Sequence, residues 1–396
     1  MIDAFEFLRW AAALFCGVSL FGVALTVALG LLAPSLTARR LRRSDTPPVS
    51  FVIPIKAHEP GFDEAQASIF EQNYPQFDVT ITAAEGESEA VAAARQILAA
   101  YPQIPAAVVR STARFAASPK VDNLYQAVED ARYDLIATKD SNIELPPDAM
   151  RAAVAAMTDD VGLVTAVTEA RGATNLPAAI ECALMNQSHA RVLYAATALG
   201  LGFGLGKLMV FRRRDLHRAG GFHAIAHSVG EDSAMAHALA RLGLRTVILG
   251  TPIFQRLGAR KLGDIYQRQL RWAVIRRHNE LPAFLIEPFG LSVCAAMAAA
   301  LAAPLAGWSA LTGGALALGL WFALETLLAL ARGWDVSMNA PAIMIARDAM
   351  MLGIWLRAWF TKRVVWAAEK YDAHRERGPL SASASPAAQT RKRNDT

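Results

Sequence analysis

Short apolar, β-prone runs alternate with helical segments through the first half of the chain. Val49–Ile55 is such a run and is followed by the polar loop Lys56–Gly61, and Phe77–Ala84 is another. Helical segments of about 10 to 15 residues between short strands are typical of a mostly parallel, doubly wound sheet. We therefore predict a nucleotide-binding α/β domain, with strands near residues 49–55, 77–84, 106–110, 135–138 and 161–168, and helices between them.

The stretch Tyr133–Pro147 is the clearest candidate for chemistry. Its apolar strand, Leu135–Thr138, ends on a polar loop that carries Asp140 and Asn142. In open α/β sheets ligands bind at the carboxyl ends of the strands. An Asp at that edge can hold a divalent cation, which in turn holds a diphosphate. The alternative is a loop acid that caps the helix starting near Asp148.

The N-terminal part of the chain is apolar without interruption. Residues 10–38 contain no charge, which exceeds the roughly 20 residues that span a bilayer. Asp3 and Glu6 precede this run and Arg39–Arg43 follows it, so the positive-inside rule predicts an anchor with the following domain in the cytoplasm. A cleaved signal peptide is the alternative, but its basic residues would precede a shorter apolar core.

A second uncharged run covers residues 289–324 and is broken by Pro304. As helix it would be about 54 Å long, slightly short of two bilayer cores of about 30 Å. We predict two short spans joined by a tight turn, or a re-entrant hairpin. Residues 340–360 are apolar but include Arg347 and Asp348, and the basic tail favours an interfacial helix over a further span.

Composition agrees with a membrane protein that has a soluble part. The 396 residues are 54% hydrophobic and 19% charged, with a net charge of +5. The excess basic residues lie beside apolar segments and in the tail, so we expect no nucleic-acid partner. The spacing of the three cysteines pairs none of them, so we predict neither a disulfide framework nor a zinc site. The predicted divisions are an anchor (1–38), a cytoplasmic catalytic domain (39–280), a membrane region (281–370) and a disordered basic tail (371–396).

The middle of the chain adds further candidates. A long helix is predicted over Leu176–Ala196, followed by the glycine-rich run Gly200–Gly206, which lacks the spacing of a phosphate loop and is either a strip packed beside a lipid or a simple loop. Glu231-Asp232 opens a helix, where an acid is either functional or a cap. A later helix, beginning near Leu262, carries Arg268 and Arg271 on one face, which can clamp a diphosphate or form a solvated basic face.

These motifs together resemble the membrane-bound family 2-type glycosyltransferases, and most closely the ceramide glucosyltransferase group (family 2/21 type). The resemblance covers roughly residues 45–370, and each motif alone is weak. In order, the matching segments are Lys120–Leu124 (similar to KVxNL), Asp140–Asn142 (DSx), His189–Arg191 (His-x-Arg), Glu231-Asp232 (ED) and Arg268–Trp272 ([Q/R]xxRW).

The resemblance implies a GT-A fold and inverting transfer of a hexose from a UDP-sugar to a lipid hydroxyl. A single displacement needs a general base on the acceptor oxygen and stabilisation of the leaving diphosphate. The base is then Asp232 with Glu231 beside it, and Asp140 with Asn142 holds Mg²⁺ or Mn²⁺. The other implied residues are Glu85, Glu87, Lys120, Asn123, Arg268, Arg271 and Trp272 at the donor, and His189 and Arg191 near the acceptor.

Two features depart from the group's pattern. Glu85 and Glu87 stand where the group usually has Asp, and Glu is one methylene longer, which changes its reach toward the nucleotide. Asn142 stands in place of the second Asp of a DxD motif. Some relatives in the ceramide group also lack that Asp, so the departure does not indicate an inactive protein.

The acceptor implied by the closest resemblance is ceramide, at the cytoplasmic face of what we expect to be a bacterial inner membrane. A hopanoid polyol is the alternative, because related bacterial transferases share these motifs. A processive polysaccharide synthase would need more spans than this chain offers. From a different class, an inactive membrane scaffold would not need to retain Asp140, Asp232 and Arg271.

Overall fold

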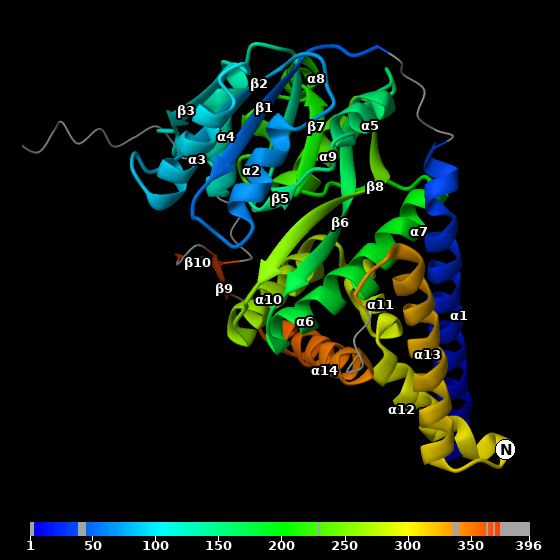
Figure 1. Cartoon of the computed structure of the whole chain (residues 1–396). Coiled ribbons are helices and arrows are strands. Elements are labelled where there is room, and N and C mark those ends of the chain that lie inside the picture. Colours follow the sequence, from blue (N-terminus) through cyan, green and yellow to red (C-terminus); the bar gives the residue numbers. More distant parts are fainter. Residues whose placement is uncertain are drawn as a thin grey trace, which may run out of the picture.

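An eight-stranded mixed sheet lies above a group of apolar helices in the computed structural model (Figure 1). The structure describes residues 4–38, 45–228, 230–335, 340–361, 363–366 and 369–372. The basic flank 39–43 and most of the predicted tail lie outside the described residues. The strands are β1 (Val49–Ile55), β2 (Phe77–Ala83), β3 (Ala106–Arg110), β4 (Leu135–Lys139), β5 (Ile143–Glu144), β6 (Val161–Ala173), β7 (Leu208–Arg212) and β8 (Arg245–Gly258).

The sheet order is β3-β2-β1-β4-β7-β6-β8-β5. Strands β3, β2, β1 and β4 are parallel, so their carboxyl ends meet at one edge. Strand β7 is antiparallel to both β4 and β6 and was not predicted from the pattern. The predicted α/β mixed sheet is thus confirmed, with antiparallel strands both in its middle (β7) and at one edge (β5, which pairs with β8).

Helices cover both faces of the sheet, as a doubly wound arrangement requires. On one face α2 (Phe62–Phe70), α3 (Glu89–Ala100) and α5 (Ala149–Ala156) pack on the strands. On the other face lie α4 (Pro119–Glu129), α8 (Arg213–Arg218) and α9 (Glu231–Ala240). Both α4 and α9 begin near the carboxyl edge of the parallel strands, which brings their first turns together.

The apolar helices form the lower part of Figure 1. Among the described residues, α1 (Ala4–Ala38) and α13 (Ala310–Arg332) are long and apolar enough to cross a membrane. Helix α12 (Ser292–Ala302) packs against α13, and a side chain at Gly313 would meet the Ala299 carbonyl oxygen at 2.7 Å. The hairpin therefore depends on small residues at the helix contact, as is common in membranes.

The helix predicted over residues 176–196 is not regular. It consists of α6 (Leu176–Ala183), a π-helical segment, η1 (Leu184–Ala190), and α7 (Arg191–Leu199). Within η1 the Asn186 side chain accepts from the Ala170 N–H at 2.7 Å and donates to the Ala170 carbonyl at 2.9 Å. This pair of bonds ties the wider turn to β6, and π-helical turns are frequent at functional sites.

Four buried charged residues join the apolar helices, and we call them the junction cluster: Arg191, Glu325, Arg347 and Asp348. Arg347, from α14 (Ala340–Ala358), lies 3.1 Å from Glu325 and 2.6 Å from Asp348. Arg191 donates to Thr26 of α1 at 2.6 Å and lies 3.9 Å from Glu325. The guanidinium of Arg191 is therefore engaged among these helices, and its implied place near the acceptor stays a prediction.

Candidate active site

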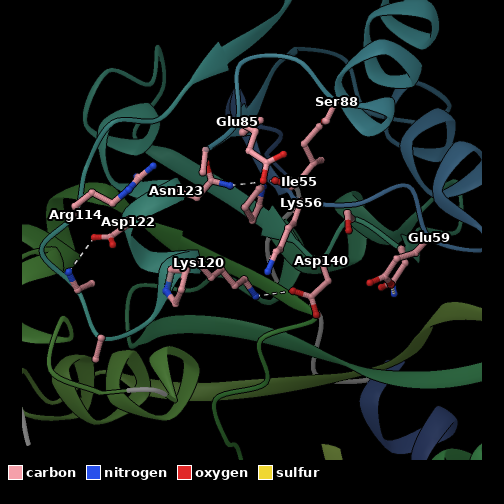
Figure 2. A pocket seen from close by; sticks show the side chains of 18 of the residues that line it. Ile55, Lys56, Glu59, Glu85, Ser88, Arg114, Lys120, Asp122, Asn123 and Asp140 are labelled. Atoms are coloured by element: carbon pink, nitrogen blue, oxygen red, sulfur yellow. Dashed lines mark hydrogen bonds and ion pairs between the residues drawn. The ribbon is translucent and has the colours of Figure 1, made fainter. Parts of the chain in front are cut away.

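A cavity of about 740 Å³ lies at the carboxyl ends of β1, β2 and β4 (Figure 2). This is the edge at which open α/β sheets bind their ligands. Four cationic and four acidic side chains line it. The charged lining residues are Lys56, Arg114, Lys120, Arg271, Glu59, Glu85, Asp122 and Asp140.

Asp140 stands at the end of β4, where the sequence placed it, and lines the cavity. Its loop is held from several sides: the backbone N–H of Asp140 donates to the Lys207 carbonyl at 3.3 Å, and the Gln66 amide donates to the Ser141 carbonyl at 2.7 Å. The side-chain amide of Asn142 donates to Glu59 at 2.5 Å. Since the loop is fixed by these bonds, the carboxylate is presented to the cavity in a defined position.

Lys120, in the first turn of α4, links the two acidic motifs. Its ammonium donates to Asp140 at 2.6 Å and to the Gly206 carbonyl at 2.7 Å, and it lies 3.2 Å from Glu231. The three contacts come from segments 20 to more than 100 residues apart in sequence. We call Lys120, Asp140, Glu231 and Asp232 the site cluster.

Asp232 lies in the first turn of α9 beside Glu231. It accepts hydrogen bonds from the Gly206 N–H at 2.9 Å and the Ser233 N–H at 2.8 Å. Burial, and then the Glu231 carboxylate, raise the pKa of Asp232 to about 6. The N-cap residue of α9 is Gly230, with no side-chain cap bond, so capping does not explain this acidic pair.

The glycine-rich run packs tightly against the site cluster. A side chain at Gly204 would meet the Asp232 carbonyl oxygen at 2.1 Å, and one at Gly202 would meet the Thr246 carbonyl oxygen at 1.9 Å. At Gly206 the added atom would lie 3.3 Å from polar atoms of Lys120, Glu231 and Asp232. The glycines therefore let the backbone itself supply the N–H and C=O that hold the cluster.

The two arginines of α10 (Leu262–Asn279) do not act as a matched pair. Arg271 lines the cavity, and burial together with neighbouring Arg268 lowers its pKa. Arg268 is ion-paired with Glu181 of α6, which is buried and also lies 3.6 Å from Arg260. A buried carboxylate that the sequence did not single out therefore engages Arg268, and the two-arginine clamp stays a prediction.

The two acidic residues that follow β2 also differ in their surroundings. Glu85 lines the cavity (Figure 2), whereas Glu87 is not among the lining residues and pairs with Arg95 at 2.8 Å. Asn123 lines the cavity but its amide donates to the carbonyls of Ile55 and Thr82, at 3.3 and 3.1 Å. Asn123 therefore joins the ends of β1 and β2 and shapes the cavity wall.

His189, in η1, and Trp272, in α10, lie together. Their ring centroids are 6.3 Å apart. Burial, followed by the charges of Arg276 and Lys207, lowers the pKa of His189 to about 3. The imidazole is therefore neutral at physiological pH and can donate or accept a hydrogen bond.

Lys56, Glu59 and Arg114 line the cavity but were not named as site residues. Lys56 and Glu59 follow β1 directly, so their position after a predicted strand was a usable signal. Arg114 lies after β3, and no motif marks it. Its place depends on the loop that Asp122 anchors by accepting the N–H groups of Phe115 and Ala116 at 2.9 Å.

The donor set suits a divalent cation only in part. The described residues contain no group of three or more His, Cys, Asp or Glu side chains that could hold a metal alone. Mg²⁺, however, is usually held by one or two carboxylates together with substrate phosphates. Asp140 supplies one such carboxylate at the cavity. The side-chain N–H of Asn142 donates to Glu59, and the amide oxygen of Asn142 is the atom that can serve as a further ligand.

The family model described as Glycosyl transferase family 21 matches residues 13–378. The chain belongs to this family. The match includes the apolar helices as well as the sheet, so the family 21 assignment covers both parts of Figure 1. The predicted family resemblance is thereby confirmed, and with the mixed α/β sheet it agrees with the predicted GT-A class.

This family 21 chain is similar to ceramide glucosyltransferase 1 of Caenorhabditis elegans, with 25% identity over 244 residues, 61% of this chain and 52% of the relative. It is also similar to the ceramide glucosyltransferase of Komagataella phaffii (strain GS115 / ATCC 20864), with 24% identity over 301 residues, 61% of this chain and 58% of the relative. The chain thus spans little more than half the length of these relatives.

Among solved structures, the mannosyltransferase PcManGT from Pyrobaculum calidifontis in complex with GDP-Man and Mn²⁺ has a TM-score of 0.48 and 20% identity, over 85% of this chain and 99% of that one. Glucosyl-3-phosphoglycerate synthase from Mycobacterium tuberculosis in complex with Mn²⁺, UDP and glucosyl-3-phosphoglycerate has a TM-score of 0.35 and 15% identity, over 60% of this chain and 80% of that one. Both TM-scores are below 0.5. The fold class is therefore assigned from the family 21 match and the mixed sheet.

Proposed function

We propose that the protein transfers a hexose from a UDP-sugar to the hydroxyl of a membrane lipid, with inversion, and that the lipid is ceramide. The observation that carries this proposal is the site cluster, in which Lys120 links Asp140 at the cavity to the buried Glu231, the neighbour of Asp232. Family membership and the names of the relatives, ceramide glucosyltransferases, support the same substrates.

Asp232 is the general base of the proposed reaction. Its carboxylate is ionised above about pH 6 and is held by two backbone N–H groups. As the acceptor oxygen attacks the anomeric carbon, its proton passes to Asp232 and the bond to the UDP oxygen breaks. A raised pKa makes the carboxylate a stronger base while leaving it ionised at neutral pH.

Arg271 and Lys120 balance the charge that develops on the leaving diphosphate. Arg271 borders the cavity, and a guanidinium can bind phosphate oxygens in a bidentate manner. Asp140, with the amide oxygen of Asn142, would hold Mg²⁺ or Mn²⁺, which supplies Lewis-acid stabilisation of the diphosphate. Glu85, which also lines the cavity, is assigned to the nucleoside.

The proposed site faces the cytoplasm, where UDP-sugars are available. The basic segment Arg39–Arg43 follows the α1 span, and the positive-inside rule assigns that end to the cytoplasm. We assign His189 and Trp272 to the acceptor side, because η1 contacts the α13 span and Trp272 directly follows the cavity residue Arg271. Their neutral, partly apolar surface suits a lipid head that carries hydroxyl groups.

The test is nucleotide release by detergent-solubilised protein. UDP-glucose and other UDP-sugars are supplied with ceramide, a hopanoid polyol, diacylglycerol or no lipid, with and without Mg²⁺. We expect UDP release that depends on ceramide and on the metal. Release with the hopanoid alone would change the acceptor, and absence of release from protein that still binds UDP would contradict the transferase proposal.

A further inference from the structure

Six large apolar side chains are exposed where α11 (Leu281–Ile286) meets the end of α14. The two segments contact each other: Trp355 donates to the Phe284 carbonyl at 2.8 Å, and the Phe284 ring lies 5.2 Å from that of Trp359. An exposed group of this size marks an interaction surface more often than a single exposed Leu does. The members of this α11–α14 patch, between 41% and 84% exposed, are Leu281, Leu285, Ile286, Leu356, Trp359 and Phe360.

The patch is continuous with the membrane helices. Residues 281–290 bend by 64° into residues 292–306, which pack against the α13 span. Residues 292–306 amount to about 25 Å of helix, less than the about 30 Å core that α13 crosses. If the turn at Trp308 lies at the far surface of the membrane, Ser292 lies inside the near leaflet. The bend therefore puts α11 at the level of that leaflet.

The carbonyl groups at the end of α14 have hydrogen-bond partners within the protein, as a region poor in water requires. The last carbonyl groups of a helix have no partners within the helix, and in lipid the protein must satisfy them. The Arg277 guanidinium donates to the carbonyls of Ala358, Trp359 and Thr361, at 2.5, 2.6 and 3.3 Å. One side chain of α10 thus serves three carbonyls directly beside the patch.

The same helix connects the patch to the cavity. Arg277 and Arg271 both belong to α10, and six residues of helix correspond to about 9 Å. Leu270 and Val274 of α10 pack in the same core as Phe284 and Ile354. The patch is therefore joined to Arg271 through α10 and through the core that α10 shares with α11 and α14.

We infer that the α11–α14 patch is embedded in the leaflet nearest the catalytic domain, and that the lipid acceptor reaches the site sideways from that leaflet, beside α10. The partner of this surface is the hydrocarbon of one leaflet, because its exposed members are apolar and continue into a span. The entry route rests on the proposed function, whereas the depth of the patch does not.

Depth is measured by quenching of tryptophan emission in proteoliposomes. Lipids brominated on the acyl chains and acrylamide in the water are compared, on the wild type and on Trp359→Phe. We expect the emission lost in the variant to be the part that brominated lipid quenches and acrylamide does not. If that part is quenched by acrylamide instead, the patch lies in water and the inference is overturned.

The route is tested with Leu285→Gln/Ile286→Gln, and with Val109→Gln as an exposed apolar control on β3. We expect the double variant to keep the wild-type Kd for UDP and transfer to a short-chain, water-dispersed acceptor. Its transfer to the long-chain lipid in proteoliposomes should fall at least tenfold. Equal effects on both acceptors, or none on either, would overturn the route, while inactivity of the wild type on both would contradict the proposed function and leave the quenching result standing.

Discussion

Two clusters of opposite charges lie in this protein, and their surroundings differ. In the junction cluster Arg191, Glu325 and Arg347 are at most 3% exposed, and two cations face two anions. In the site cluster Asp140 is 37% exposed at a cavity, and the Lys120 ammonium contacts two carboxylates, Asp140 and Glu231, while Asp232 adds a third acid beside Glu231. A buried, balanced cluster has its groups satisfied by the protein. An open, unbalanced one leaves charge for a ligand, which distinguishes a candidate active site from a structural contact.

The largest effect is expected from Asp232→Asn. If the carboxylate takes the acceptor proton, its loss lowers the rate of transfer by about 10² to 10⁴-fold while the Kd for UDP changes little. UDP release under saturating substrates and calorimetry with UDP measure the two quantities. Glu87→Gln is the matched control, because Glu87 pairs with Arg95 outside the cavity. Transfer at the wild-type rate in Asp232→Asn would remove the residue from the base role.

The junction cluster should respond in stability and not in chemistry. Arg347→Met removes the cation that pairs with both Glu325 and Asp348 and leaves only Arg191, 3.9 Å from Glu325, which costs about 3–5 kcal/mol of unfolding free energy. The double variant Glu325→Gln/Arg347→Met keeps the cluster balanced and should lose less. Thermal unfolding in detergent measures both, with the Kd for UDP of the folded fraction as control. Equal stability of the wild type and Arg347→Met would show that the ion pairs of the junction cluster do not stabilise the fold.

The two arginines of α10 sharpen the comparison within one helix. Arg271→Gln should raise the Kd for UDP about 10-fold or more, since charge-assisted hydrogen bonds contribute about 1.5–3 kcal/mol. Arg268→Gln should change it by less than about threefold, because Arg268 is engaged by Glu181. Calorimetry with UDP compares the pair. Equal losses would support the two-arginine clamp.

The acid limb of the pH–rate profile should report Asp232. With a pKa of about 6, the carboxylate is protonated below that pH, so the rate should fall about tenfold per pH unit there and level off above it. Because the Glu231 charge contributes to raising the pKa of Asp232, Glu231→Gln should move the limb to lower pH. An unchanged limb in this variant would mean that a group other than Asp232 controls it.

Much of the fold and the identity of the acidic motifs could be read from the sequence. Alternating strands and helices predicted the sheet, and uncharged runs predicted the helices α1 and α13, because periodicity and hydropathy are local properties. Strands β5, β7 and β8 were missed: β5 has only two residues, and β7 directly follows a glycine-rich run. The π-helical turn was missed because it depends on the bonds of Asn186 to β6, which residue type does not reveal.

The sequence by itself determined which residues can carry chemistry: Asp140 after a strand, Glu231-Asp232 at a helix start and Arg271 on an amphipathic helix. Only the tertiary structure decided how they are used. In the folded protein Lys120 contacts both Asp140 and Glu231. Arg268 pairs with Glu181, and Arg191 lies in the junction cluster beside Glu325. The physical reason is that the charge and burial of a side chain depend on partners that lie far away along the chain, and no local pattern names those partners.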